Sequence, residues 1–230
     1  MSRRAVIIGG ASLAAIAIVV VLIVVSIGGG GDDSFASGGE IRGVTEAVAL
    51  TKGLPQSGYS IGKASAPVTV REFIDPQCPI CKKAAVDSLP PLIKGPVRAG
   101  TARVIIVPLT FIGPDSATAA QAIGAAAAQG RAWPYTEILY ANQGAENSGW
   151  VTDDLLTGIA GTVPGLDVAK WNAARTTGAV ASGLFDAADL AKGQAVNATP
   201  TFVVTGPGGR QVLSGAVLPQ GLLDAVKAAS

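Results

Sequence analysis

Phe73-Ile74-Asp75-Pro76-Gln77-Cys78-Pro79-Ile80-Cys81-Lys82-Lys83 contains the only two cysteines of a 230-residue chain, and they form a C-x-x-C pair. The residues before it, 68–74, alternate in polarity and are rich in β-branched side chains, which is typical of a half-buried strand. Pro79 suits the first turn of a helix, where its missing N–H leaves no intrahelical bond unmade. The pattern therefore predicts a strand, a turn and a helix that begins at Cys78.

A cysteine at the start of a helix differs chemically from an ordinary one. Unpaired backbone N–H groups and the positive end of the helix dipole stabilise a thiolate more than a thiol. In C-x-x-C motifs the pKa of such a cysteine falls from about 8.5 to roughly 3.5–7.5. We therefore expect Cys78 to be the nucleophile and Cys81, one turn further and more buried, to be the resolving cysteine of a redox-active Cys78–Cys81 disulfide.

Three other interpretations of the cysteine pair remain open. A purely structural disulfide between residues so close in sequence would constrain the unfolded chain very little. A zinc site would need more ligands, and the sequence has no histidine and no second cysteine pair. Two reduced core cysteines beside a turn are the third alternative. A redox pair is the favoured interpretation, and it requires neither a metal nor an organic cofactor.

The N-terminal segment predicts export. Residues 5–27 carry no charge and are long enough to span a bilayer as a helix. Residues 1–4 are then a cytoplasmic N-terminus, and residues 28–40 a flexible linker to an extracytoplasmic domain at 41–230. The apolar run is longer than that of a signal peptide, which favours an uncleaved transmembrane anchor, although Ser34-Phe35-Ala36 offers a cleavage site. Both alternatives place the cysteines in an oxidising compartment.

The rest of the chain predicts a mixture of strands and helices. A second, buried strand is expected at residues 103–107, parallel to the first because a helix connects them. That helix must bend or stop by Pro90-Pro91, since proline removes intrahelical hydrogen bonds. The other expected elements are a helix at 41–50, several helices within 114–197 (117–130, 133–140, one capped by Thr152, one capped by Asp167, and one or two at 178–194), a hairpin of 201–205 and 210–214, and a helix at 218–229. The aromatic residues spaced as helix-core packing residues, rather than as a cofactor site, are Trp133, Tyr135, Tyr140 and Trp171.

Three stretches of this sequence resemble those of a known family. They are Glu72 to Lys83, similar to an active-site strand and helix start; Ala126-Ala127-Ala128-Gln129-Gly130 through Asn142-Gln143-Gly144, similar to a helical insertion; and Asn197-Ala198-Thr199-Pro200-Thr201-Phe202-Val203-Val204, similar to the loop before a hairpin. Over about residues 67–230 the chain resembles the DsbA-like thiol–disulfide oxidoreductases, in their membrane-anchored bacterial type. The fold class thus implied is α/β: a thioredoxin-like fold with an inserted α-helical domain at about 114–197, preceded by one N-terminal transmembrane helix.

The resemblance assigns roles beyond the cysteines. In the family, the proline that matches Pro200 follows a cis peptide bond and its loop faces the cysteines. Thr199 would then lie beside Cys78, where its backbone can pair with an extended substrate peptide. The expected substrate-binding residues are therefore Thr199, Pro200, Pro79 and Ile80. An ordinary trans proline at the start of a strand is the alternative for Pro200.

Glu72 matches a position where the family commonly has a buried acid, which implies a proton relay to and from Cys81. An inward Glu72 requires Phe73 to face the other side of the sheet, so a solvated carboxylate remains the alternative. The chain also departs from the family pattern, with Ile80 where the strongest oxidants have histidine and Ala198 where glycine is common. Because Ile80 cannot donate a hydrogen bond to the thiolate, we expect a less lowered pKa and a weaker oxidant.

The leading hypothesis is an exported, membrane-anchored enzyme that introduces disulfides into unfolded secreted or cell-envelope proteins with cysteines. The resemblance implies that a quinone-linked membrane oxidase re-oxidises it, and we expect a monomer. A net charge of +1 gives no reason to expect a nucleic-acid partner.

Two other functions remain open. The first is a reductase or isomerase kept as a dithiol by a membrane electron donor. The segment 32–63 is too short and glycine-rich for the N-terminal dimerisation domain that isomerases of this fold usually carry, which favours the oxidase. The second is a non-catalytic, anchored peptide-binding or chaperone module. The presence of Cys78, Cys81 and Pro200 counts against it.

Overall fold

The computed structural model describes residues 39–230. The expected cytoplasmic N-terminus at 1–4, the anchor at 5–27 and nearly all of the linker at 28–40 lie outside these residues. Within 39–230, no helix combines the length and the apolar character needed to cross a membrane. The elements in chain order are α1 (Val44–Thr51), β1 (Gln56–Ser57), β2 (Ser60–Ile61), β3 (Val68–Ile74), α2 (Pro79–Lys83), η1 (Ala84–Ser88), α3 (Leu89–Leu92), η2 (Ile93–Val97), β4 (Ala102–Pro108), α4 (Pro114–Ala127), α5 (Ala132–Ala141), α6 (Asp153–Thr162), α7 (Val168–Ala174), α8 (Gly178–Gly193), β5 (Thr201–Gly206), β6 (Gly209–Ser214) and α9 (Pro219–Ala229).

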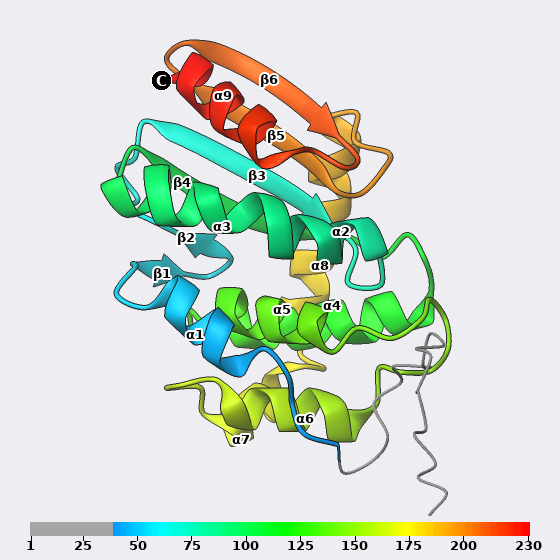
Figure 1. Ribbon diagram of the computed structural model, residues 1–230. Coiled ribbons are helices and arrows are strands. Elements are labelled where there is room, and N and C mark those ends of the chain that lie inside the picture. The colour runs from blue at the N-terminus through cyan, green and yellow to red at the C-terminus, as the bar shows by residue number, and fades with distance from the viewer. Residues whose placement is uncertain (1–38) are drawn as a thin grey trace, which may run out of the picture. The chain divides into compact units, whose positions relative to one another are not determined.

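A six-stranded sheet in the order β1-β2-β4-β3-β5-β6 forms the centre of the described domain (Figure 1). β3 pairs in parallel with β4 and antiparallel with β5, so it lies in the middle of the sheet with a partner on each side. The parallel pairing of the two strands, expected from the helix that connects them, is confirmed. The hairpin of β5 and β6 and the C-terminal helix α9 are confirmed as well.

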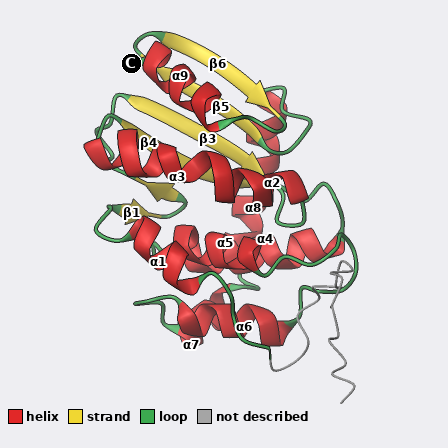
Figure 2. Ribbon diagram, viewed as in Figure 1, coloured by secondary structure: helices red, strands yellow, loops and turns green. Residues whose placement is uncertain are grey.

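Helices cover both faces of the sheet (Figure 2). α9 and the helical run from α2 to η2 lie on one face, and α8 lies on the other. β3 contributes to both layers, because successive side chains of a strand point to opposite faces. Val70 and Ile74 belong to the main core, whereas Phe73 packs with Ala187 and Ala191 of α8 in a second cluster.

The helix after the cysteines does not stop at Pro90-Pro91. Helical backbone continues from α2 to Val97, and two π-helical segments, η1 and η2, interrupt its α-helical turns. The two prolines occupy the first turn of α3, directly after η1. A π-helical turn changes the hydrogen-bond register, so prolines that cannot donate fit without ending the helix.

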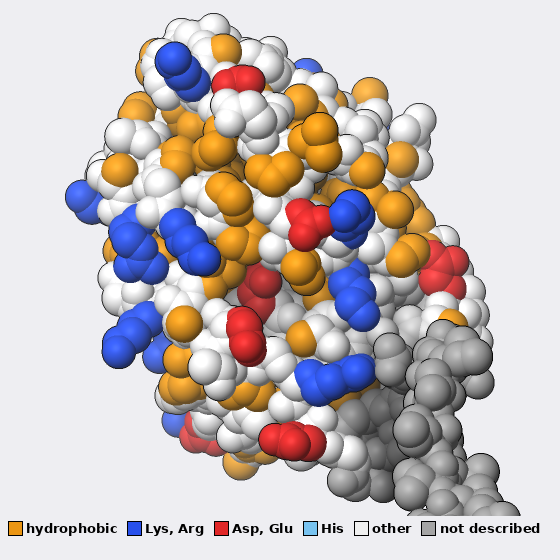
Figure 3. All heavy atoms as spheres, viewed as in Figure 1, with side chains coloured by type: hydrophobic (Ala, Val, Ile, Leu, Met, Phe, Trp, Pro, Cys, Tyr) orange, Lys and Arg blue, Asp and Glu red, His pale blue; other side chains and the backbone are white. Residues whose placement is uncertain are grey.

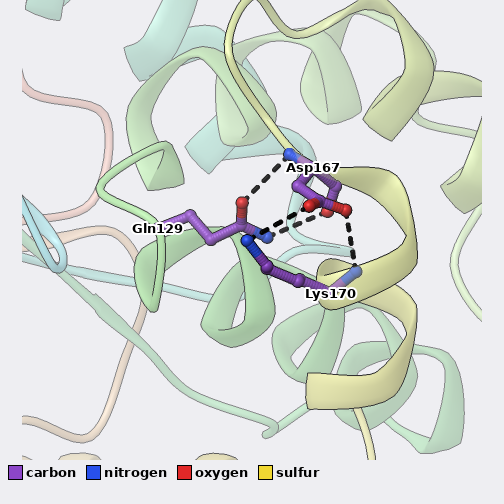
Figure 4. A network of polar contacts seen from close by, with 3 residues as sticks. All are labelled: Gln129, Asp167 and Lys170. Atoms are coloured by element: carbon purple, nitrogen blue, oxygen red, sulfur yellow. Dashed lines mark hydrogen bonds and ion pairs between the residues drawn. The ribbon is translucent and has the colours of Figure 1, made fainter.

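The inserted helical segment agrees closely with the expectation, with α4 to α8 spanning residues 114–193. Thr152 caps α6 by accepting a hydrogen bond from the N–H of Leu155, and residues 178–193 form one helix rather than two. All four predicted aromatic packing residues are buried. Asp167 caps α7 and also bonds through its backbone to Gln129, which joins the end of α4 to the start of α7 (Figure 4).

The short hairpin of β1 and β2 was not predicted. Residues 56–61 extend the sheet beyond β4, where Ile61 pairs with Val104 and is fully buried. Each strand has only two residues, too few to show an alternating pattern in the sequence.

Candidate active site

Cys78 lies at the start of α2, at the point where β3 delivers the chain to a helix. Its backbone is extended, its Sγ accepts a hydrogen bond from the N–H of Cys81 at 3.4 Å, and Pro79 occupies the first turn. The sulfur therefore takes the place of the side-chain oxygen that normally caps a helix. This confirms the predicted placement of Cys78 at a helix N-terminus.

The two thiols have opposite electrostatic environments. The pKa of Cys78 is lowered to about 6, first by a hydrogen bond from the Cys81 thiol and then, against the effect of burial, by backbone N–H groups and the Thr199 side chain. Burial, followed by the hydrogen bond to Cys78 and its charge, raises the pKa of the Cys81 thiol. At neutral pH the reduced pair is thus a Cys78 thiolate beside a Cys81 thiol. This is the arrangement of a nucleophile and a buried partner.

The Thr199–Pro200 peptide bond is cis, and its loop meets the cysteines as the resemblance implied. The carbonyl oxygen of Thr199 lies 3.4 Å from the Sγ of Cys78 and accepts a hydrogen bond from the protonated form of that thiol. Ile80 is 38% exposed beside them, and the loop before α9 places Leu218, also exposed, along the same shallow groove. A small groove with exposed apolar side chains therefore begins at Ile80, two residues after Cys78.

Glu72 is a buried acid, 2% exposed, on the same face of β3 as Val70 and Ile74. Phe73 faces the other side, so the condition for an inward Glu72 is met and the solvated alternative is wrong. Its Oε1 atom has no hydrogen-bond partner. Burial, and then the nearby charge of Glu137, raise its pKa well above the ordinary value, and its own charge raises the pKa of Cys81.

Sequence reasoning missed a polar network that holds the loop before Cys78. The buried Asp75 carboxylate accepts hydrogen bonds from the N–H of Gln77 at 2.9 Å, the hydroxyl of Ser116 at 2.6 Å and the N–H of Ile112 at 3.0 Å. The Gln77 side chain in turn bonds to Ser116 and to Asn147. The loop is therefore tied to the start of α4 and to the loop after α5.

Gln143 and Tyr140 complete the support from the helical insertion. The Nε2 of Gln143 donates to the carbonyl oxygens of Pro76 at 2.8 Å and Cys78 at 3.1 Å, and the Tyr140 hydroxyl donates to the carbonyl oxygen of Asp75 at 3.1 Å. Gln143 lies in one of the three stretches that carry the family resemblance, and this was the only feature of the sequence that pointed to it as a site residue. Its role could not be read there, because its acceptors are backbone atoms 65 and 67 residues away.

The described residues do not bring together a metal site. In the range 39–230, no three histidine, cysteine or acidic side chains are grouped so as to hold a metal ion. The site thus consists of two thiols, a buried acid and a peptide loop.

Comparisons with known proteins agree with this geometry. The family model described as Thioredoxin matches residues 55–212. The chain is 35% identical over 115 residues to the probable disulfide bond formation protein D of Bacillus cereus, covering 49% of this chain and 53% of the relative. It is 32% identical over 148 residues to the disulfide bond formation protein D of Bacillus subtilis, covering 63% of this chain and 66% of the relative. The chain thus spans about half the length of the first of these relatives.

Solved structures give the same result over a longer stretch. The oxidised BdbD of Bacillus subtilis superposes with a TM-score of 0.66 at 26% identity, over 76% of this chain and 95% of that one. A thioredoxin-like oxidoreductase from Silicibacter pomeroyi superposes with a TM-score of 0.59 at 27% identity, over 80% of this chain and 96% of that one. The similarity includes the helical insertion as well as the sheet.

Proposed function

The chain belongs to the thioredoxin family, among its DsbA-like thiol–disulfide oxidoreductases, and from this premise we propose that it donates the Cys78–Cys81 disulfide to exported proteins. The observation that carries the proposal is the pair of opposed thiol environments, with the pKa of Cys78 at about 6 and that of Cys81 raised. A stabilised Cys78 thiolate favours the reduced form of the protein, which makes its disulfide a better oxidant.

The proposed reaction has two exchange steps. A substrate thiolate attacks the Cys78 sulfur, the bond between the two cysteines breaks, and Cys81 leaves with the electron pair as a thiolate. Glu72, whose pKa is raised by burial and by the charge of Glu137, gives Cys81 its proton. A second substrate thiolate then attacks the substrate sulfur of the mixed disulfide, and Cys78 leaves as a thiolate. The substrate gains one disulfide and the protein is left as a dithiol.

Thr199, Pro200, Pro79 and Ile80 are the proposed substrate-binding residues. The Thr199 backbone lies beside the Cys78 sulfur, where an extended peptide that reaches the sulfur also reaches a backbone partner. Ile80 offers an exposed apolar contact next to it. Recognition through backbone atoms and a small apolar surface suits substrates that share only an unfolded state and a cysteine.

The cellular setting is part of the proposal. The uncharged segment 5–27 would anchor the protein in a membrane, with the domain at 41–230 on the outer side. A quinone-linked membrane oxidase would re-oxidise the dithiol, and the protein would act as a monomer. The family relationship supports an extracytoplasmic location, since the relatives in Bacillus are named for disulfide bond formation.

The test is the redox equilibrium of the full chain against glutathione, with trapped thiols counted by mass spectrometry. A reduction potential between about −180 and −120 mV would place the protein with disulfide donors. A value below about −230 mV would replace the oxidase proposal by a reductase. The lack of any reversible disulfide would leave a peptide-binding module, whose function in cells a Cys78→Ala substitution would not remove.

A further inference from the structure

Glu137 is a second acidic side chain near the site that the reaction above does not use. It lies on α5, one turn before Tyr140, and is half-buried. Both residues line a hollow of about 540 Å³, whose walls are α1, α5 and the helical run that follows the cysteines. In Figure 3 this face is hollowed between α1 and α3, with acidic side chains in the hollow and at its edge. Glu137 is thus in reach of solvent.

Glu137 also acts on the buried acid of the active site. It is the charged group that raises the pKa of Glu72 beyond the effect of burial. Glu72, in turn, has an unpartnered Oε1 atom and acts electrostatically on Cys81. The Cys81 thiol and the Glu72 carboxyl are buried, whereas Glu137 is half-buried and lines the hollow beside Tyr140. The Tyr140 hydroxyl reaches the carbonyl oxygen of Asp75, which directly follows the end of the strand that carries Glu72.

A buried relay needs a route by which its proton is replaced. Glu72 is 2% exposed, so after giving a proton to Cys81 it would remain as an isolated buried carboxylate, which is unfavourable. Burial raises the pKa of Glu137 to about 8, so this group holds a proton at neutral pH and can pass it on. The negative charges of two neighbouring carboxylates repel each other, so one of the two groups tends to stay protonated. This favours the transfer of a single proton between them.

We propose that Glu137 is the outer carboxyl of a two-acid relay, returning a proton from solvent in the hollow to Glu72 after Glu72 has protonated Cys81. This inference rests on the proposed function. The Cys81 thiolate takes the Glu72 proton, the Glu72 carboxylate takes the Glu137 proton, and water in the hollow re-protonates Glu137. The net uptake is one proton for each cleaved disulfide. Glu137 acts through Glu72 and does not touch the reacting sulfurs.

The other charged and titratable groups that line the hollow around Glu137 are not suited to return a proton to Glu72. Glu46 of α1 and Lys94 of η2 also line the hollow, but both are exposed, and neither is among the charges that raise the pKa of Glu72. The Tyr140 hydroxyl donates to the carbonyl oxygen of Asp75 and is engaged there. Glu137 is therefore the carboxyl that is both coupled to Glu72 and open to the hollow.

The experiment follows the single-turnover reduction of the oxidised full chain by dithiothreitol between pH 5.5 and 9, in H₂O and in D₂O. The variants are Glu137→Gln, Glu137→Asp, Glu72→Gln and, as a matched control, Glu46→Gln, which neutralises an exposed carboxyl of the same hollow.

We expect Glu137→Gln to slow the reduction roughly tenfold below pH 8 and to increase the solvent isotope effect. The wild type should approach the variant above pH 8, where Glu137 is ionised. Glu137→Asp should keep most of the rate, and Glu46→Gln all of it.

A rate profile of Glu137→Gln that superposes on the wild type would overturn the inference, as would an equal loss in Glu46→Gln. If Glu137→Gln does not fold, Ala49→Trp provides the second test. Ala49 is an exposed residue of α1 that lines the hollow, and a bulky side chain there should hinder water and slow the reduction without changing a carboxyl. The absence of any reversible disulfide in the wild type would contradict the proposed function instead. If the wild type forms a reversible disulfide, and Glu72→Gln slows its reduction whereas Glu137→Gln does not, this inference is overturned and the proposed function is retained.

Discussion

The Sγ atom of Cys78 lies 3.4 Å from the carbonyl oxygen of Thr199, although the two residues are 121 positions apart. The sheet brings them together, because β3 and β5 are neighbouring antiparallel strands. β3 ends shortly before Cys78, and β5 begins shortly after Thr199. The pairing of Phe73 with Thr201 places the loop before β5 beside the start of α2. A substrate sulfur that reaches Cys78 therefore also reaches the backbone of Thr199.

The lowered pKa of Cys78 should depend more on Cys81 than on Thr199. Cys81 supplies the largest contribution through its thiol and a further one through its backbone N–H, whereas the Thr199 side chain contributes less. We expect Cys81→Ala to raise the pKa of Cys78 by about one unit or more, and Thr199→Val by roughly half a unit or less. The absorbance of the thiolate near 240 nm, followed against pH, measures both shifts. A larger effect of Thr199→Val would contradict the structure.

The reduction potential should change its pH dependence near pH 6. Below the pKa of Cys78, reduction takes up two protons for two electrons, and above it only one, because Cys78 stays a thiolate while Cys81 remains protonated. The slope should therefore fall from about 59 mV to about 30 mV per pH unit. Equilibration of the full chain with glutathione between pH 5 and 8 provides the measurement. A constant slope of about 59 mV per unit up to pH 8 would show that Cys78 has an ordinary pKa.

Gln143 should be important for the stability of the site. Gln143→Ala removes the side-chain donor of the Pro76 carbonyl oxygen and leaves the Cys78 carbonyl oxygen with only the N–H of Lys82, so we expect a loss of about 2 kcal/mol in the free energy of unfolding. Gln129 is a matched control, since its amide also bonds to backbone atoms, those of Asp167, but at an exposed position (Figure 4). Gln129→Ala should cost about 1 kcal/mol or less. Urea unfolding of the two variants would compare them, and equal losses would speak against a special role of Gln143.

Glu72 should destabilise the folded protein at neutral pH. Its pKa is raised in the folded state, so the folded protein favours the protonated carboxyl. The free energy of unfolding is therefore highest below the ordinary glutamate pKa of 4.5 and decreases as the pH rises above that value. Glu72→Leu should raise the free energy of unfolding at pH 7.5 by about 2 kcal/mol, while slowing disulfide exchange.

This change in stability is best measured in a Cys78→Ser background. The Cys78 thiolate titrates with the opposite sign: its lowered pKa stabilises the reduced protein above the ordinary value of 9.0, and that stability is lost as the pH falls through about 6. Glu46→Leu, at an exposed position, serves as the control and should change the stability little. A Glu72→Leu variant less stable than its parent at pH 7.5 would show that the carboxyl has a stabilising partner.

The sequence by itself determined the local structure and the type of chemistry. The alternating strand at 68–74, the proline after Cys78 and the C-x-x-C spacing depend on neighbouring residues only, and they correctly predicted a cysteine at a helix start. The helical insertion and the final hairpin follow from local patterns too. Of the two outcomes expected at the prolines at 90–91, a bend or a stop, the stop does not occur, because η1 shifts the hydrogen-bond register before them.

Only the tertiary structure decided how the site is completed. The Asp75 network, the contact of Gln143 with the backbone at Cys78 and the coupling of Glu137 to Glu72 join segments about 40 to 70 residues apart. Such contacts depend on how strands and helices pack, and a residue's own neighbourhood in the sequence does not encode them. The burial of Glu72 had the same origin: alternation allowed either face, and the helices packed on the sheet made its face the interior.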